Sequence, residues 1–161
     1  MNPNANQFIS IMGSSFKSRL FMFTKLPAAY FAGVKVKTLQ TDKAVVTVPY
    51  KWLSQNPFRS TYFACLAMAA EMSTGLLAMM QLHHRKPFVS MLVVKLEANY
   101  FKKATGVTAF TCNAGKAFEQ IVDDCIADGE ARTYTATSTG TNDAGEVVAE
   151  FFITWSFKAK K

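Results

Sequence analysis

Several signatures of common enzyme classes are missing from this sequence. There are only three cysteines (Cys65, Cys112 and Cys125), with neither a CxxC pair nor the spacing of metal ligands. Three distant cysteines are typical of reduced, mostly buried thiols, so we expect a cytoplasmic protein without disulfides or a bound metal. There is also no GxSxG motif, which disfavours a Ser-His-Asp hydrolase.

Histidine is equally scarce. The two histidines, His83 and His84, are adjacent, so on a helix their side chains diverge and cannot ligate one metal ion together. They follow a long apolar stretch, where cations suit the C-terminal end of a helix dipole. We therefore expect them to have a local structural role.

Acidic residues are few. The chain has 11 Asp and Glu against 18 Lys and Arg, which gives a net charge of +7. The basic residues are scattered and form no dense run, so we expect no nucleic-acid partner. An anionic small molecule, such as a nucleotide-bearing cofactor, would explain the same bias.

The most informative stretch is a long apolar segment at residues 61–82. It contains no proline and is rich in Ala, Leu and Met, which predicts one helix of roughly six turns. Because it is apolar nearly all round, we expect it to be buried. Its length could span a bilayer, but Glu71 lies at its centre and predicted strands follow it, so we expect no membrane span and no membrane partner.

Glu71 is the one charged residue in this segment. A lone carboxylate on a buried helix is costly unless it has partners or a chemical role. Glu71 is therefore either a catalytic carboxylate or a structural one held by nearby donors.

The N-terminal region predicts one or two amphipathic helices over residues 4–25, with Gly13 as a break and a loop around Pro27. We expect one continuous apolar face along these helices. Its predicted members are Phe8, Ile11, Met12, Phe16, Leu20 and Phe23. The start of the sequence lacks the basic region of a signal peptide, and we expect none.

The remaining segments alternate between apolar and polar residues, as half-buried strands do. The predicted strands are residues 34–40, 44–50, 89–103, 107–114, 131–141 and 146–157. A short helix is predicted at residues 116–127. Because strands and helices do not alternate, a doubly wound sheet is disfavoured, and one antiparallel sheet with a single long helix across it fits best.

This order resembles the hot-dog fold, an α+β fold in which a curved antiparallel sheet wraps one long helix. The spacing of Asn56 and Glu71, fifteen residues apart, resembles that of the thioesterase branch with the phenylacetate-pathway and 4-hydroxybenzoyl-CoA enzymes. The stretch NYFKKA at residues 99–104 resembles the Asn-Tyr-x-x-Pro-Ala motif of that branch. Within the superfamily the chain looks most like a poorly characterised domain of unknown function from short bacterial proteins.

The resemblance implies a division into three parts: an N-terminal helical extension at residues 1–32, a hot-dog domain at 33–157 and a basic tail at 158–161. It also implies a homodimer, or a dimer of dimers. The substrate would be a thioester of coenzyme A or of an acyl carrier protein, with coenzyme A entering only as part of the substrate.

The resemblance also implies roles for residues. Glu71 would be the general base or nucleophile, Asn56 would contact the carbonyl or the attacking water, and the Phe63 N–H would polarise the carbonyl oxygen. In the family, the helix start of one protomer serves the carboxylate of the other. The predicted substrate-binding residues are Tyr62, Arg59, Thr74 and Gly75.

The sequence departs from the family pattern in three places. Tyr62, Phe63 and Ala64 replace His-Gly-Gly, so the Phe63 side chain stands where glycine would let substrate approach the backbone. Gly75 occupies a position where one branch has Thr, although Thr74 is adjacent, and Lys103 replaces Pro.

Simpler interpretations of these residues stay open. Asn56 could be a turn residue before a proline, Tyr62 a packing residue, and Arg59 either a solvated charge or a contact to phosphate or to the partner's carboxylate. The chief alternative function is a non-catalytic hot-dog protein that binds acyl-CoA or fatty acyl groups. A hot-dog dehydratase is disfavoured because no histidine lies near Asn56.

Overall fold

A computed structural model describes residues 2–160. Its chain begins with three short helices, α1 (Ala5–Gly13), α2 (Ser15–Lys25) and α3 (Pro27–Ala32). The sequence predicted a loop around Pro27, and this was wrong. Proline is well suited to the first turn of a helix, where its missing N–H is not needed, and here it opens α3.

Six strands form one antiparallel sheet in the order β1-β2-β4-β5-β6-β3. They are β1 (Lys35–Leu39), β2 (Ala44–Val48), β3 (Val89–Tyr100), β4 (Thr108–Cys112), β5 (Arg132–Thr141) and β6 (Val147–Ala159). All six predicted strands are present. The longest, β6, runs to Ala159 and so passes Phe157, where the sequence pattern ended it.

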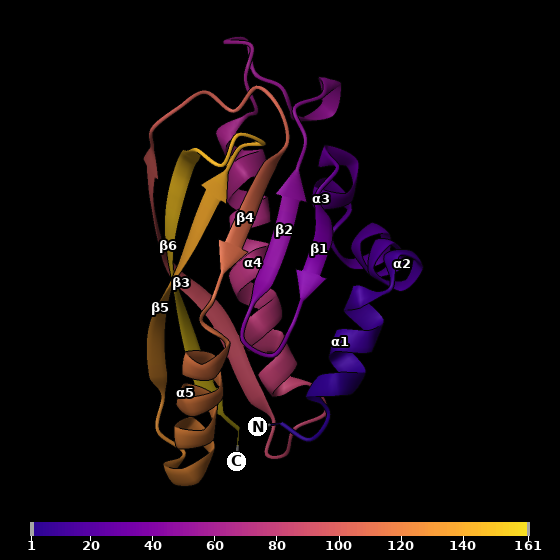
Figure 1. The fold of residues 1–161 in the computed structure, drawn as a ribbon. Helices are drawn as coiled ribbons and strands as arrows, with labels where there is room; N and C mark the ends of the chain where they lie inside the picture. Colours follow the sequence, from indigo (N-terminus) through magenta and orange to yellow (C-terminus); the bar gives the residue numbers. More distant parts are fainter. Residues whose placement is uncertain (1, 161) are drawn as a thin grey trace.

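The long helix α4 (Phe63–Leu82) lies against the sheet, which curves around it (Figure 1). This is the hot-dog architecture that the sequence predicted. A one-turn 3-10 helix, η1 (Trp52–Ser54), precedes α4, and α5 (Gly115–Asp128) packs against β5 and β6. The three N-terminal helices lie beside β1, on the side of the molecule away from β5 and β6 (Figure 1).

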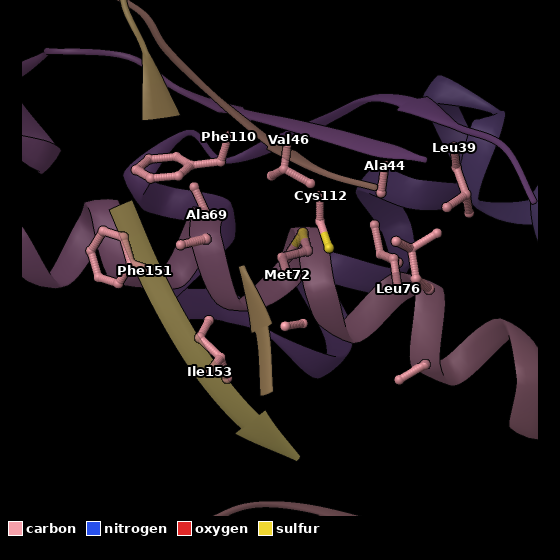
Figure 2. Close-up of a cluster of buried hydrophobic side chains, with 14 of the residues drawn as sticks. Leu39, Ala44, Val46, Ala69, Met72, Leu76, Phe110, Cys112, Phe151 and Ile153 are labelled. Carbon is pink, nitrogen blue, oxygen red and sulfur yellow. The ribbon is translucent and has the colours of Figure 1, made fainter. Parts of the chain in front are cut away.

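The core lies between α4 and the concave face of the sheet. Ala69, Met72 and Leu76 of α4 face Val46 of β2 and Phe110 of β4 (Figure 2). All five side chains are buried, and Val46 and Phe110 are fully so. Although α4 has the length and hydropathy of a membrane span, 67% of its apolar window is buried inside the fold. That is typical of the core helix of a soluble protein.

The start of α4 differs from the sequence prediction. The helix was expected to begin at residue 61, but it begins at Phe63, and the residue before it, Tyr62, makes no side-chain cap. The Ser60 and Thr61 hydroxyls are used elsewhere: that of Ser60 donates to the Asn56 side chain, and that of Thr61 to the Ala104 carbonyl. The N-terminus of α4 therefore keeps free donors.

The predicted apolar face of the N-terminal helices is continuous only through α1. Phe8 and Met12 are buried as expected, whereas Phe16, Leu20 and Phe23 of α2 are exposed. The backbone leaves the helical conformation at Ser14, whose ψ is 119°, so α2 starts in a new direction. Its inward face is then formed by Ser18 and Met22.

Candidate functional site

Glu71 lies near the middle of α4 and faces the N-terminal helices. It lines two cavities of about 240 and 250 Å³, both of which are also lined by Lys25, Leu26 and Met72. We call them the Glu71 cavities. Most of the other side chains that line these cavities are apolar, among them Met12, Phe21, Leu26, Met68, Met72, Leu76 and Met79. The Glu71 carboxylate and the Lys25 ammonium group are thus the charged groups among the residues that line these cavities.

Within residues 2–160, the Glu71 carboxylate makes no hydrogen bond and no ion pair. Burial raises the pKa of Glu71 above its ordinary value of 4.5, because desolvation disfavours the charged form. No neighbouring charge offsets this effect. A carboxylate with a raised pKa and unused acceptor oxygens is a stronger base than an exposed one and is suited to proton transfer.

Gly75 provides the space beside this carboxylate. A methyl group built at Gly75 would lie 3.4 Å from Glu71 Oε1 and 3.3 Å from the Trp155 ring. Both contacts are tight, so a larger residue would press on the carboxylate. Gly75 therefore lies beside the Glu71 carboxylate, one turn further along α4.

Thr74 has a different environment. Its hydroxyl accepts a 2.9 Å hydrogen bond from Trp155 Nε1 and donates a 2.9 Å bond to the Glu71 carbonyl oxygen. The side chain is fully buried and lines neither Glu71 cavity. Thr74 thus links the Glu71 turn of α4 to β6. Its side chain does not line the cavities where a substrate could bind.

A separate, larger cleft of about 620 Å³ lies at the N-terminus of α4. We call it the helix-start cleft. It is bounded by residues 56–63 on one side and 100–104 on the other. Tyr62 and Phe63 project into it with their rings 4.9 Å apart in an edge-to-face pair, and both rings are about half exposed.

The first two N–H groups of α4, those of Phe63 and Ala64, have no acceptor within residues 2–160. The helix dipole adds a partial positive charge at this end. The helix-start cleft therefore offers donors to an oxyanion or a carbonyl oxygen. Lys103 is at the rim, where its Nζ donates to the Phe58 carbonyl oxygen at 3.4 Å.

Asn56 lies in the helix-start cleft, and its side chain organises its own loop. The Oδ1 atom accepts from the N–H groups of Phe58 (3.0 Å) and Ser60 (3.2 Å), and Nδ2 donates to the Ser60 hydroxyl (3.1 Å). Arg59, between Phe58 and Ser60 in the same turn, has a left-handed φ of 58° and does not line the cleft. In a single chain the Asn56 amide is thus occupied by local bonds.

The predicted residues form two groups. Asn56, Tyr62 and Phe63 meet in the helix-start cleft, whereas Glu71 and Gly75 meet in the Glu71 cavities. The groups are eight residues apart on α4, roughly 12 Å along the axis at 1.5 Å per residue. Within one chain, the carboxylate therefore does not reach the N–H groups of its own helix start.

Sequence reasoning missed the contribution of the N-terminal helices to the site. Lys25 and Leu26 line both Glu71 cavities, and Met12 and Phe21 line one of them. The apolar periodicity of residues 4–25 signals that these helices pack on something. It does not specify that they cover Glu71, because that depends on where α2 turns after Gly13.

Neither metal chemistry nor thiol chemistry has support in the described structure. Within residues 2–160, no group of three His, Cys, Asp or Glu side chains could hold a metal ion. All three cysteines are buried and free, and burial raises the pKa of the Cys112 thiol to about 11. A protonated, buried thiol is a poor nucleophile, so Glu71 is the better candidate for a reactive side chain.

Comparisons with known proteins agree with the fold. The family described as "Domain of unknown function (DUF4442)" matches residues 14–157. Similar solved structures include a protein of unknown function from Chlorobaculum tepidum, with a TM-score of 0.77, 17% identity, and coverage of 91% of this chain and 94% of the other. No curated protein matches the sequence.

Two further similar structures carry functional names. A protein from Pseudomonas aeruginosa, of unknown function and described as a probable thioesterase, has a TM-score of 0.72, 16% identity and 99% coverage of both chains. A thioesterase from Haemophilus influenzae has a TM-score of 0.65, 10% identity and 91% coverage of both chains. At these identities the likeness establishes the fold alone.

Proposed function

The chain belongs to the DUF4442 family and has the hot-dog fold of thioesterase-like proteins, and from this premise we propose that it hydrolyses acyl thioesters. The observation that carries the proposal is Glu71, a partly buried carboxylate with a raised pKa and no protein partner within residues 2–160. Such a group can act as a general base toward water or as a nucleophile.

The second requirement of the reaction is a donor for the oxyanion that develops on the thioester carbonyl. The free N–H groups of Phe63 and Ala64 meet this need chemically, but they lie in the other cavity of the same chain. We therefore propose that a complete site forms in a homodimer, where the helix start of one copy faces Glu71 of the other. A dimer of dimers would keep the same arrangement.

The sheet offers an edge for such a dimer. β3 is an edge strand of twelve residues, and its exposed side chains include Leu92 (66%), Val94 (52%) and Leu96 (45%). A long apolar edge strand tends to pair with another chain. Pairing of β3 with β3 of a second copy would join the two sheets and bury these side chains.

The proposed substrate is an acyl thioester of coenzyme A or of an acyl carrier protein, and the proposed location is the cytoplasm. The apolar lining of the Glu71 cavities suits an aliphatic or aryl acyl group. Lys103, at the rim of the helix-start cleft, is available to an anionic carrier group such as a phosphate. No metal or further cofactor enters the proposed reaction.

One observation favours a second candidate function, binding of acyl-CoA without hydrolysis. Phe63 stands in the helix-start cleft where the thioesterase branch has a glycine, and the Tyr62 ring packs edge to face against it. If these rings keep the carbonyl away from the free N–H groups, the cleft would hold a ligand without turnover.

A hydrolysis assay across short, long and aryl acyl-CoAs distinguishes the two. Wild type is compared with Glu71→Ala and Glu71→Gln, and Glu130→Gln, an exposed carboxylate outside these cavities, serves as the matched control. Circular dichroism and sizing establish that each variant keeps its fold and assembly.

We expect wild type and Glu130→Gln to be active and both Glu71 variants to lose at least ~100-fold, as is typical for removal of a general base. Full activity in folded Glu71→Gln would exclude the proposed role of the carboxylate. If no variant turns over any thioester while acyl-CoA raises the melting temperature, the binding function replaces hydrolysis.

A further inference from the structure

The outward face of α2 is unusual for a helix on a folded domain. Phe16, Leu20 and Phe23 follow the i, i+4, i+7 spacing of one helical stripe and are 78%, 52% and 53% exposed. The inward face is formed by Ser18 and Met22. A surface helix normally turns its apolar stripe toward the core, so here the larger apolar stripe points the other way.

Two aromatic residues of α3 extend this stripe. The Phe23 ring contacts those of Tyr30 and Phe31 edge to face, with centroids 5.2 and 6.3 Å away. Phe31 is 52% exposed. We call Phe16, Leu20, Phe23, Tyr30 and Phe31 the α2–α3 surface. Helices α2 and α3 lie on the outer side of the molecule, beyond β1 (Figure 1).

The segment that carries the α2–α3 surface has charge of one sign. The sequence contains no Asp or Glu before Asp42, although it contains five cations in that region: Lys17, Arg19, Lys25, Lys35 and Lys37. The Arg19 guanidinium is 4.9 Å from the Tyr30 ring centroid and donates to the Tyr30 hydroxyl at 3.1 Å. One cation, Arg19, therefore stands directly beside an aromatic ring of this surface.

We propose that the α2–α3 surface docks on an anionic membrane surface. Helices that lie in the interface of a bilayer combine exposed Phe and Leu on one face with flanking Lys and Arg. The apolar side chains enter the boundary of the acyl region, and the cations contact anionic headgroups. This revises the sequence expectation of no membrane partner, which rested on the lack of a spanning segment. Surface docking needs no such segment.

The charge pattern selects a lipid surface over a second copy of this chain. Two α2–α3 surfaces placed face to face would bring Lys17 and Arg19 of each copy toward those of the other. No carboxylate from the first 41 residues could offset that repulsion. An anionic headgroup layer supplies the missing negative charge.

The same segment also lines the Glu71 cavities, through Phe21, Lys25 and Leu26. Docking through the opposite face of α2 would leave this one helix between the cavities and the lipid. The docking proposal does not depend on thioester hydrolysis, because it concerns only the outward side chains.

Co-sedimentation with vesicles tests the proposal. Full-length protein is mixed with vesicles of phosphatidylcholine alone or of phosphatidylcholine with about one-third phosphatidylglycerol, at low and at physiological salt. The variants are Phe16→Ser/Phe23→Ser and Lys17→Glu, whose side chains are exposed and lie outside the Glu71 cavities. Phe88→Ser, a 61% exposed aromatic between α4 and β3, is the matched control.

We expect wild type and Phe88→Ser to bind the anionic vesicles at least ~10-fold better than the neutral ones, with weaker binding as salt rises. The double Phe variant and Lys17→Glu should each lose at least ~5-fold on anionic vesicles. Unchanged binding by the double Phe variant would overturn the proposal, because the net positive charge alone would then explain the binding. Absence of wild-type binding at low salt would also overturn the proposal. If the double Phe variant forms a smaller oligomer than wild type, the surface serves self-association instead.

Discussion

The division of the site between two cavities gives a test of the proposed dimer by complementation. One variant, Glu71→Gln, removes the carboxylate. The other, Phe63→Pro, removes the free N–H at the first position of α4. Proline fits this position because the Phe63 N–H bonds no acceptor within residues 2–160, and Tyr62 has a φ of −61° and a ψ of 134°.

Each variant should be nearly inactive alone. Loss of a general base costs typically ~100-fold or more, and loss of one oxyanion donor costs on the order of 100- to 1,000-fold. In a mixed dimer, one site combines the intact Glu71 of one copy with the intact helix start of the other, and the second site lacks both. Random mixing makes half of the dimers mixed, so about a quarter of wild-type activity should return.

The assay measures thioester hydrolysis after the two variants are co-refolded at equal concentrations, with native mass spectrometry counting the mixed dimers. Phe63→Ala is the control, because it removes the same 56% exposed ring but keeps the N–H, and it should keep most of the activity. If mixed dimers form and activity stays at the level of the single variants, the site is not shared between copies. If Phe63→Pro alone is fully active, the N–H is not the oxyanion donor.

Two further predictions concern backbone packing and the titration of Glu71. Gly115→Ala should lower the free energy of unfolding in urea by about 2–3 kcal/mol, because the added methyl would lie 2.1 Å from the Thr41 carbonyl oxygen. Gly13→Ala should instead raise the free energy of unfolding by about 0.5–1 kcal/mol, because its added methyl would meet no atom within 4 Å and alanine favours the helix. Equal effects of the two substitutions would refute this reasoning. Because burial raises the pKa of Glu71 in the folded state, the protein loses stability as pH rises above 4.5, and this loss levels off once pH has passed the folded-state pKa. Glu71→Gln should therefore match the wild-type melting temperature near pH 4.5 and exceed it at pH 7.5, and a constant difference across this range would contradict the assigned cause.

The sequence was sufficient for the architecture because the fold depends on patterns that are local. The run of Ala, Leu and Met from Phe63 to Leu82 can bury all its faces only as a core helix, and alternation in the segments before and after it predicted all six strands. The resemblance to the hot-dog fold followed from the order of these elements. Glu71 was identifiable for the same reason: it is the one charge on that helix.

The sequence was less informative where a residue's role depends on neighbours distant in the chain. Thr74 and Gly75 are adjacent, yet Thr74 bonds to Trp155 across the core while Gly75 opens beside Glu71. The spacing of Asn56 and Glu71 suggested one site, but eight residues of helix separate Glu71 from the helix start of its own chain.

The N-terminal helices also show what local sequence predicts and what only the tertiary structure determines. Their apolar periodicity predicted helices correctly, but it also predicted one apolar face that continues through Phe23. Only the change of direction at Ser14 decided that α1 packs its apolar face inward and α2 turns Phe16 outward. Periodicity depends on the residues within one helix, whereas burial of a face depends on the path of the chain between helices, and a single extended residue sets that path.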